Sequence, residues 1–281
     1  MIISIASGKG GTGKTTIAVN LALSLENNAQ FLDCDVEEPN AYIFLKPQIT
    51  QMYPVSIPIP KVDESKCVHC SICQKICAYH AIIVIKNRVL VFPELCHGCG
   101  GCSLLCPEKA ITEINKEIGH VYIGNSNNLQ FIQGELNIGE PMPTPVIKAV
   151  KQSIDLSKVV IIDSPPGTSC PVIESVKKSD FCILVTEPTP FGLNDLMLAV
   201  GLLRKLNIPF GVVINRSDLG NDETDRYCEN EDIPVLMRIP FKREIAEAYS
   251  RGIPLVEAFP DYKEDFQNLF DKIKQLMEGD K

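Results

Sequence analysis

The 281-residue sequence lacks the features that would place it in a membrane or on nucleic acid. It has no apolar run near the ~18 residues that a transmembrane helix needs, and its first six residues lack the basic region of a signal peptide. It also lacks an excess of positive charge, because 27 Lys and Arg residues oppose 35 Asp and Glu residues to give a net charge of -8. Such a chain has no electrostatic footprint for nucleic acid or for an anionic membrane. We therefore expect a cytoplasmic protein that binds neither.

The composition is that of a globular protein, with 45% hydrophobic and 22% charged residues, which excludes fibrous and disordered classes. At ~150 residues per domain, the length predicts two compact units or one larger unit with an insert. The sequence has twelve cysteines, and eight of them lie between Cys67 and Cys106. Because disulfides are rare in a reducing cytosol, this dense cluster predicts metal binding.

Apolar segments alternate with helical patterns along most of the chain, which predicts an α/β fold. Buried strands that alternate with helices form a mostly parallel sheet covered by helices on both faces. We expect residues 1–60 and 116–281 to form this P-loop NTPase domain. The predicted strands are 2–6, 30–33, 159–163, 181–186, 210–215 and 235–239.

Residues 61–115 form a predicted insert, and prolines 47, 54, 58 and 60 are expected to break the strand pattern before it. The insert contains a repeat with a spacing of 29 residues. At this spacing, each of the first four cysteines corresponds to one of the last four, and Ala81-Ile82 corresponds to Ala110-Ile111. A duplicated small module is therefore expected. Its middle predicts short strands at 81–85 and 89–92. Further strands are predicted at 120–123 and 129–132, but their position in the sheet is not defined by the sequence.

The segment that follows the first predicted strand matches the phosphate-binding pattern Gly8-x4-Gly13-Lys14-Thr15. Lys14 would contact the β- and γ-phosphates, and the Thr15 hydroxyl would ligate Mg²⁺. The same glycines also fit a dinucleotide fingerprint, with an acidic residue about 20 positions later at Asp33. A lysine and a threonine directly after the last glycine favour a nucleoside triphosphate. The loop residues expected to bind it are Gly8, Lys9, Gly10, Gly11, Thr12, Gly13, Lys14, Thr15 and Thr16.

The loop Lys9-Gly-Gly-Thr-Gly-Lys-Thr15 resembles the deviant Walker A loop of the MinD, Mrp and nitrogenase iron protein group of ATPases. In that group the additional lysine, here Lys9, contacts phosphate across a dimer interface, so the resemblance implies a homodimer with ATP between its subunits. The alternative is that Lys9 is an ordinary exposed loop lysine.

The resemblance extends to two acidic segments and two strand ends. It implies that Asp35 is the hydrolytic residue with Asp33 in support, and that Asp163 lies near Mg²⁺. Within Asp163-Ser-Pro-Pro-Gly-Thr168, Gly167 would sense the γ-phosphate. By resemblance alone, Asn215 and Pro240 would hold the adenine. Lys9, Lys14, Asp35 and Asp163 are thus the expected catalytic residues.

The cysteine spacing matches the ligand run of bacterial two-cluster ferredoxins, in which the fourth cysteine of each run ligates the other cluster. This resemblance implies a ferredoxin-like α+β insert with two 4Fe-4S clusters. One cluster is expected on Cys67, Cys70, Cys73 and Cys106, and the other on Cys96, Cys99, Cys102 and Cys77. A zinc ribbon on Cys67, Cys70, Cys96 and Cys99 is the alternative, but it leaves four cysteines without a role. Ala78 departs from the pattern, since the second run has Pro107 at that place.

Cys170 lies near the position where nitrogenase iron proteins carry a ligand of a cluster shared between subunits, but no second matching cysteine is present. An isolated cysteine is therefore the default interpretation. The main functional hypothesis is an ATPase that couples ATP to electron transfer or to iron–sulfur assembly on a partner protein. The alternative is a spatial or partitioning switch of the MinD and ParA type, in which the clusters are structural.

Overall fold

The buried apolar segments form one large sheet in the computed structural model, which describes residues 1–25 and 28–279. Its strands are β1 (Ile2–Ala6), β2 (Ala29–Asp33), β3 (Gln48–Val62), β6 (Ile111–Ser126), β7 (Leu129–Leu136), β8 (Val159–Asp163), β9 (Phe181–Thr186), β10 (Phe210–Asn215) and β11 (Val235–Ile239). In the described residues they follow the order β11-β10-β9-β1-β8-β2-β7-β6-β3. The strands from β11 to β7 are parallel, whereas β6 and β3 are antiparallel to their neighbours.

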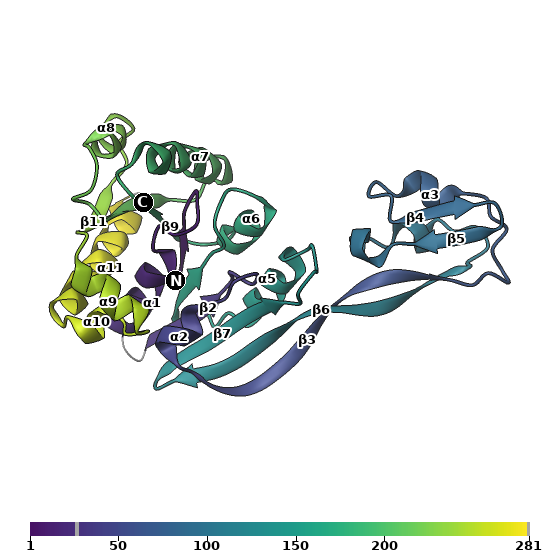
Figure 1. Ribbon diagram of the computed structural model, residues 1–281, viewed down its shortest axis with the longest axis horizontal. Helices are drawn as coiled ribbons and strands as arrows, with labels where there is room; N and C mark the ends of the chain where they lie inside the picture. Colours follow the sequence, from purple (N-terminus) through teal and green to yellow (C-terminus); the bar gives the residue numbers. More distant parts are fainter. Residues whose placement is uncertain (26–27, 280–281) are drawn as a thin grey trace.

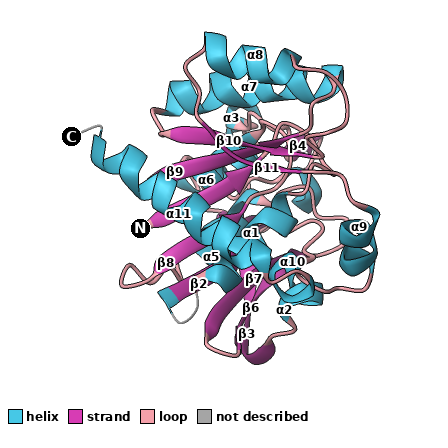
Figure 2. Ribbon diagram, turned by 90° about the vertical axis from the view of Figure 1, so that its left-hand side faces the viewer, coloured by secondary structure: helices cyan, strands magenta, loops and turns pink. Residues whose placement is uncertain are grey.

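Helices cover both faces of this sheet, because alternate strand residues point to opposite sides (Figure 2). Ile3, Ile5 and Phe31 pack on one face against α1 (Lys14–Ser24) and α11 (Asp261–Gly279). Short helices complete that face: α2 (Ala41–Leu45), α9 (Arg243–Ser250) and α10 (Leu255–Ala258). The other face carries α5 (Thr144–Lys151), α6 (Cys170–Val176), α7 (Pro190–Leu206) and α8 (Glu223–Asn230). The predicted mostly parallel sheet between helices is confirmed.

The prediction that prolines break the strand pattern is wrong for three of the four, because only Pro47 lies outside a strand, directly before β3. Pro54, Pro58 and Pro60 all lie inside β3, which pairs with β6 from Gln48 to Val62. Since β3 is the edge strand, one of its sides needs no hydrogen-bond donors, and a proline there removes no ladder bond. The predicted strands 120–123 and 129–132 are parts of β6 and β7.

The β3–β6 pair continues beyond the main sheet as a two-stranded arm (Figure 1). The pairing of β6 with β7 ends at Gly119 and Leu136, so residues 111–117 of β6 pair with β3 alone. The register of β3 and β6 shifts between Val55 and Ser56, opposite the place where β7 ends. The predicted boundaries after residue 60 and before residue 116 lie inside the two strands of this arm.

A small cysteine-bearing module, residues 63–110, lies at the far end of the arm (Figure 1). It contains α3 (Ile72–Ile76), β4 (Ile82–Ile85), β5 (Arg88–Val91), η2 (Pro93–Leu95) and α4 (Gly101–Leu104). The strands β4 and β5 correspond to the short strands predicted at 81–85 and 89–92, and they pair with each other in antiparallel fashion.

The 29-residue repeat of this module is also present in its backbone. Three pairs of residues related by the repeat adopt left-handed conformations, with φ angles between 48° and 71°. The pairs are His69 and Gly98, Ser71 and Gly100, and His80 and Lys109. The middle pair precedes α3 and α4 at equivalent places. Because non-glycine residues rarely adopt this conformation, the agreement supports a true structural duplication.

Candidate functional site

The glycine loop opens into a cleft of about 440 Å³ at the carboxyl ends of the sheet strands. This is where open α/β sheets bind their ligands. Of the predicted nucleotide-binding residues, those lining the cleft are Gly10, Gly11, Gly13, Lys14, Thr15, Thr16, Asp35, Asn215 and Pro240. They come from the β1–α1 loop and the first turn of α1, from the segment after β2, and from the ends of β10 and β11. Segments far apart in the sequence therefore converge on one cavity.

Gly13 is a position that only glycine satisfies. It precedes α1 with a φ of 96°, and a Cβ atom there would lie 2.5 Å from Nδ2 of Asn215. That Nδ2 donates a hydrogen bond of 2.8 Å to the carbonyl oxygen of Thr12. Asn215 thus holds the loop from the end of β10, in addition to lining the cleft.

The Thr15 hydroxyl and the Asp163 carboxylate meet at the base of the loop. Thr15 Oγ1 donates a hydrogen bond of 2.6 Å to Asp163 Oδ2. The other oxygen of this fully buried carboxylate has no hydrogen-bond partner among the described residues. Burial raises the pKa of Asp163 to about 7, although the Thr15 hydrogen bond and the Lys14 charge act in the opposite direction. A hydroxyl beside a buried carboxylate oxygen in need of a partner fits the oxygen ligands that Mg²⁺ prefers.

The two carboxylates after β2 have different surroundings. Asp33 is fully buried and accepts hydrogen bonds from the backbone N–H groups of Asp35 (3.1 Å) and Ala41 (3.2 Å). Asp33 therefore shapes the turn and does not line the cleft within the described residues. Asp35 does line it, and burial raises its pKa to about 6 against the opposing charge of Lys14. Burial lowers the pKa of Lys14 itself, and Asp163 and Asp35 counteract that shift.

Among the described residues, Lys9 does not line the nucleotide cleft of the same chain. Its Nζ is 3.8 Å from Oε2 of Glu187, and the other oxygen of Glu187 is 2.7 Å from an Arg216 nitrogen. About a third of the Lys9 side chain is exposed. Gly167, with a φ of 96°, donates its N–H to the Ser7 carbonyl oxygen at 3.0 Å. The loop after Asp163 is therefore tied to the start of the glycine loop.

The cleft also has walls that the sequence did not reveal. Phe44 of α2 and Tyr249 of α9 pack with their ring centroids 4.9 Å apart, and Phe241 and Ile245 continue the apolar wall. Arg216, next to Asn215, adds a cation. None of these residues belongs to a spaced motif. Only the folding of α2 and α9 over the loop brings them together.

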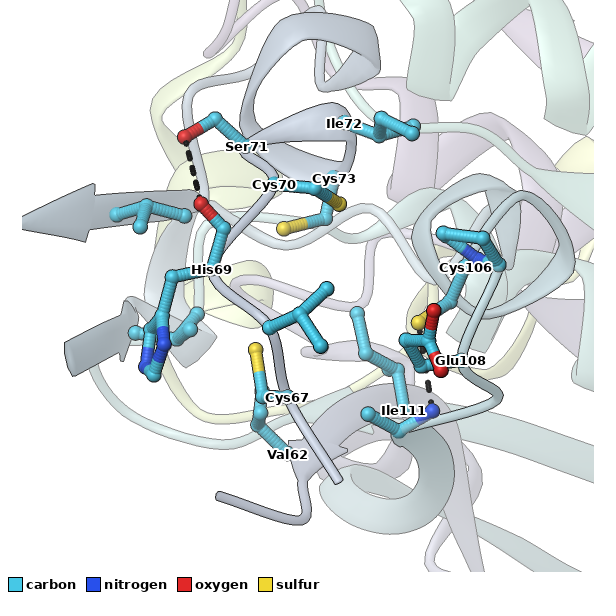
Figure 3. Close-up of a pocket in the computed structure, with 15 residues that line it drawn as sticks. Val62, Cys67, His69, Cys70, Ser71, Ile72, Cys73, Cys106, Glu108 and Ile111 are labelled. Carbon is cyan, nitrogen blue, oxygen red and sulfur yellow. Dashed lines mark hydrogen bonds between the residues drawn. The ribbon is translucent and has the colours of Figure 1, made fainter. Parts of the chain in front are cut away.

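The eight clustered cysteines divide between two cavities of the module. Figure 3 shows the first, in which the sulfur atoms of Cys67, Cys70, Cys73 and Cys106 face a common space. The second is lined by Cys77, Cys96, Cys99 and Cys102. Each cavity thus combines three cysteines of one repeat with the fourth of the other, as the ferredoxin pattern predicts. A zinc ribbon would need Cys67, Cys70, Cys96 and Cys99 in one site, whereas the structure divides them.

The local bonding in the two cavities repeats as well. Cys77 Sγ accepts a hydrogen bond from the Ala81 N–H at 3.2 Å, and Cys106 Sγ accepts one from the Ala110 N–H at 3.3 Å. Such N–H···S bonds tune iron–sulfur ligands. Residues 1–25 and 28–279 include no group of three His, Cys, Asp or Glu side chains that could hold a single metal ion. Each cavity offers four cysteines, which is the ligand count of a 4Fe-4S cluster.

Cys170 is exposed at the first position of α6. In the described part of the chain, no helix is long and apolar enough to span a membrane.

Comparison with known proteins gives both a family and a fold. The family model for the CobQ/CobB/MinD/ParA nucleotide binding domain matches residues 3–255. An uncharacterized protein of Methanocaldococcus jannaschii is 31% identical over 97% of this chain and 96% of its own length. An iron-sulfur cluster carrier protein of Pyrococcus abyssi is 25% identical over 99% of this chain and 88% of its own.

The similar solved structures include the septum site-determining protein MinD of Pyrococcus horikoshii, complexed with Mg-ADP. It superposes with a TM-score of 0.58 and 23% identity, and the match covers 98% of this chain and 96% of that one. At this identity the likeness concerns the fold.

Proposed function

Because the chain belongs to the CobQ/CobB/MinD/ParA nucleotide-binding domain family, we propose that it is a Mg²⁺-dependent ATPase whose nucleotide state controls two 4Fe-4S clusters. One observation carries the iron–sulfur half of this proposal. The eight cysteines line two cavities, and each cavity takes its fourth cysteine from the other repeat. The similarity to an iron-sulfur cluster carrier protein supports the same conclusion. Bound there, each cluster would supply a one-electron redox centre or a transferable group.

The cleft supports the ATPase half. Lys14 would contact the β- and γ-phosphates, and Thr15 with Asp163 would hold Mg²⁺. Asp35, which lines the cleft just after β2, would orient the attacking water. Lys9 is about a third exposed and its contact with Glu187 is a 3.8 Å ion pair, so we propose that it exchanges this partner for phosphate in a homodimer with ATP at its interface.

The proposed partner is a redox or metallocluster protein that exchanges electrons or a cluster with the module. The module stands at the end of an arm, away from the helices that cover the main sheet (Figure 1). A partner can therefore approach the cysteine cavities without contacting the nucleotide cleft.

The test is an anaerobic redox titration of the nucleotide-free, ADP and ATP forms. Coupling between linked sites is typically 1 to 3 kcal/mol, which for one electron corresponds to a shift of roughly 40 to 130 mV. Asp35→Ala, which should bind ATP but hydrolyse it slowly, should hold the shifted potential. Equal potentials in all three forms, with equal rates of electron transfer or cluster transfer to an acceptor, would refute coupling. A spatial switch with structural clusters would then be the better account.

A further inference from the structure

We infer that α5 links the nucleotide cleft to the cysteine arm, and that Lys151 is the positioning residue that joins α5 to α6. The inference rests on the proposed function, since it concerns how the nucleotide state reaches the module. It is carried by the contacts that α5 makes with α6 and with the β3–β6 arm, since α5 lies between them.

The path begins at the loop between β8 and α6. This loop starts at Asp163, whose carboxylate accepts the Thr15 hydroxyl at the proposed Mg²⁺ site. It is also bonded to β1 and the glycine loop, because Ser164 N–H donates to the Ile5 carbonyl and Gly167 N–H to the Ser7 carbonyl, both at 3.0 Å. A ligand that engages Thr15, Asp163 or the Gly167 N–H therefore acts directly on this loop. The helix α6 follows directly and has only seven residues, about 10 Å in length, so a displacement at its start reaches its end.

Lys151 holds the end of α6. Its Nζ donates to the carbonyl oxygens of Glu174 (2.9 Å), Ser175 (2.6 Å) and Lys177 (2.7 Å). Carbonyl groups in the last turn of a helix lack partners within the helix, and the negative end of the helix dipole attracts a cation. All three ammonium protons are used, in a partly buried place. Since Lys151 is the last residue of α5, these three bonds make α5 and α6 move together.

Besides α6, α5 contacts β7 and β2 of the main sheet and both strands of the arm at its root. Val146 packs so closely on Gly119 of β6 that a Cβ atom on that glycine would lie 3.0 Å from it. On the side of the arm, the pairing of β6 with β7 ends at Gly119. The Tyr53 hydroxyl of β3 donates to the Ala149 carbonyl of α5 at 3.4 Å. Hence α5 contacts both strands near the place where the arm loses the support of the main sheet.

The far end of the arm contacts one of the cysteine cavities. Pro58 and Pro60 of β3 line the cavity of Cys77, Cys96, Cys99 and Cys102. A change in the tilt of the arm at Gly119 therefore moves this cavity relative to the nucleotide cleft. The cavity that contains Cys106 contacts the arm at its outermost residues, Val62 and Ile111.

The experiment is hydrogen exchange by mass spectrometry on the anaerobically prepared full-length protein. Exchange in residues 54–62 and 111–118 is compared without nucleotide and with Mg²⁺ and a non-hydrolysable ATP analogue. In the wild-type protein we expect the analogue to change the rate of hydrogen exchange in these two segments of the arm by roughly 5-fold or more. Lys151→Met should abolish this response, while its nucleotide affinity stays within about 3-fold of the wild-type value. Lys151→Arg should retain part of the response. Lys148→Met changes an exposed residue of α5 and should behave as the wild-type protein.

The outcomes separate the inference from the proposed function. An arm that does not respond in the wild-type protein contradicts the coupling in the proposed function. An arm that responds equally in wild type and Lys151→Met overturns the role of α5 alone. Loss of nucleotide affinity in Lys151→Met also overturns it, because the residue would then only stabilise the cleft. If Lys151→Met does not fold, Val146→Ala, which loosens the Gly119 contact without touching α6, decides the question by the same criterion.

Discussion

The crossing of the cysteine ligands can be tested by counting iron in single and double variants. Cys106 belongs to the second repeat in sequence, but its sulfur lines the cavity of Cys67, Cys70 and Cys73. Two 4Fe-4S clusters contain about eight iron atoms per chain, so the loss of one complete ligand set should remove about four. Serine offers a hard oxygen in place of a soft thiolate and is a poor substitute ligand. Cys106→Ser alone should therefore retain about half of the iron.

The double variants tell which cluster is lost. Cys67→Ser combined with Cys106→Ser damages one cavity twice, so it should retain the same half of the iron as either single variant. Cys96→Ser combined with Cys106→Ser damages both cavities and should retain almost none. Cys228→Ala, at a buried cysteine of α8 outside the module, controls for the loss of a thiol. Iron and sulfide analysis with EPR of the reduced protein measures the result.

The opposite pattern would refute the crossing. If each repeat held its own cluster, the Cys96 and Cys106 double variant would keep half of the iron, and the Cys67 and Cys106 double variant would lose it all. Stoichiometric zinc with little iron or sulfide, in anaerobically prepared wild-type protein, would refute the cluster assignment itself.

Three further predictions concern the nucleotide cleft. Lys14→Ala should weaken nucleotide binding itself. Lys9→Ala should leave nucleotide binding largely intact and impair ATP-dependent dimerisation, measured by light scattering. An unchanged dimer in Lys9→Ala would make Lys9 an ordinary loop lysine. Gly13→Ala should cost at least about 1 kcal/mol of folding free energy in chemical denaturation and should abolish nucleotide binding, because its φ of 96° and its closeness to Asn215 exclude a side chain. Burial raises the pKa of Asp163 from 3.8 to about 7. Between these two values the folded nucleotide-free protein keeps a proton that the unfolded chain has lost. The free energy of unfolding should therefore fall as the pH rises from 4 through 7. In thermal melts at pH 8, Asp163→Asn should therefore be more stable than the wild-type protein without nucleotide, and an unchanged or lower melting temperature would contradict this reasoning.

Local features of the sequence were sufficient for the main chemistry. A strand, a glycine loop and a helix that follow one another determine where Lys14 and Thr15 lie, because few residues separate them and their backbone geometry is local. The first three cysteines of each run are equally local, since closely spaced thiolates line one cavity, whereas the fourth lines the cavity of the other repeat. Left-handed residues at equivalent places, such as Ser71 and Gly100, show that the repeat in the sequence is a repeat in the backbone.

Contacts between distant segments were decided by the tertiary structure alone. Pro54, Pro58 and Pro60 were expected to break the strand pattern, yet they lie in one 15-residue strand because β3 is at the edge of the sheet. Whether a strand is central or at an edge depends on the order of all the strands, which no local pattern encodes. The same holds for the apolar wall of Phe44 and Tyr249 and for the three bonds of Lys151. These contacts join residues that are far apart in the chain, so they exist only when the sheet and its helices have packed.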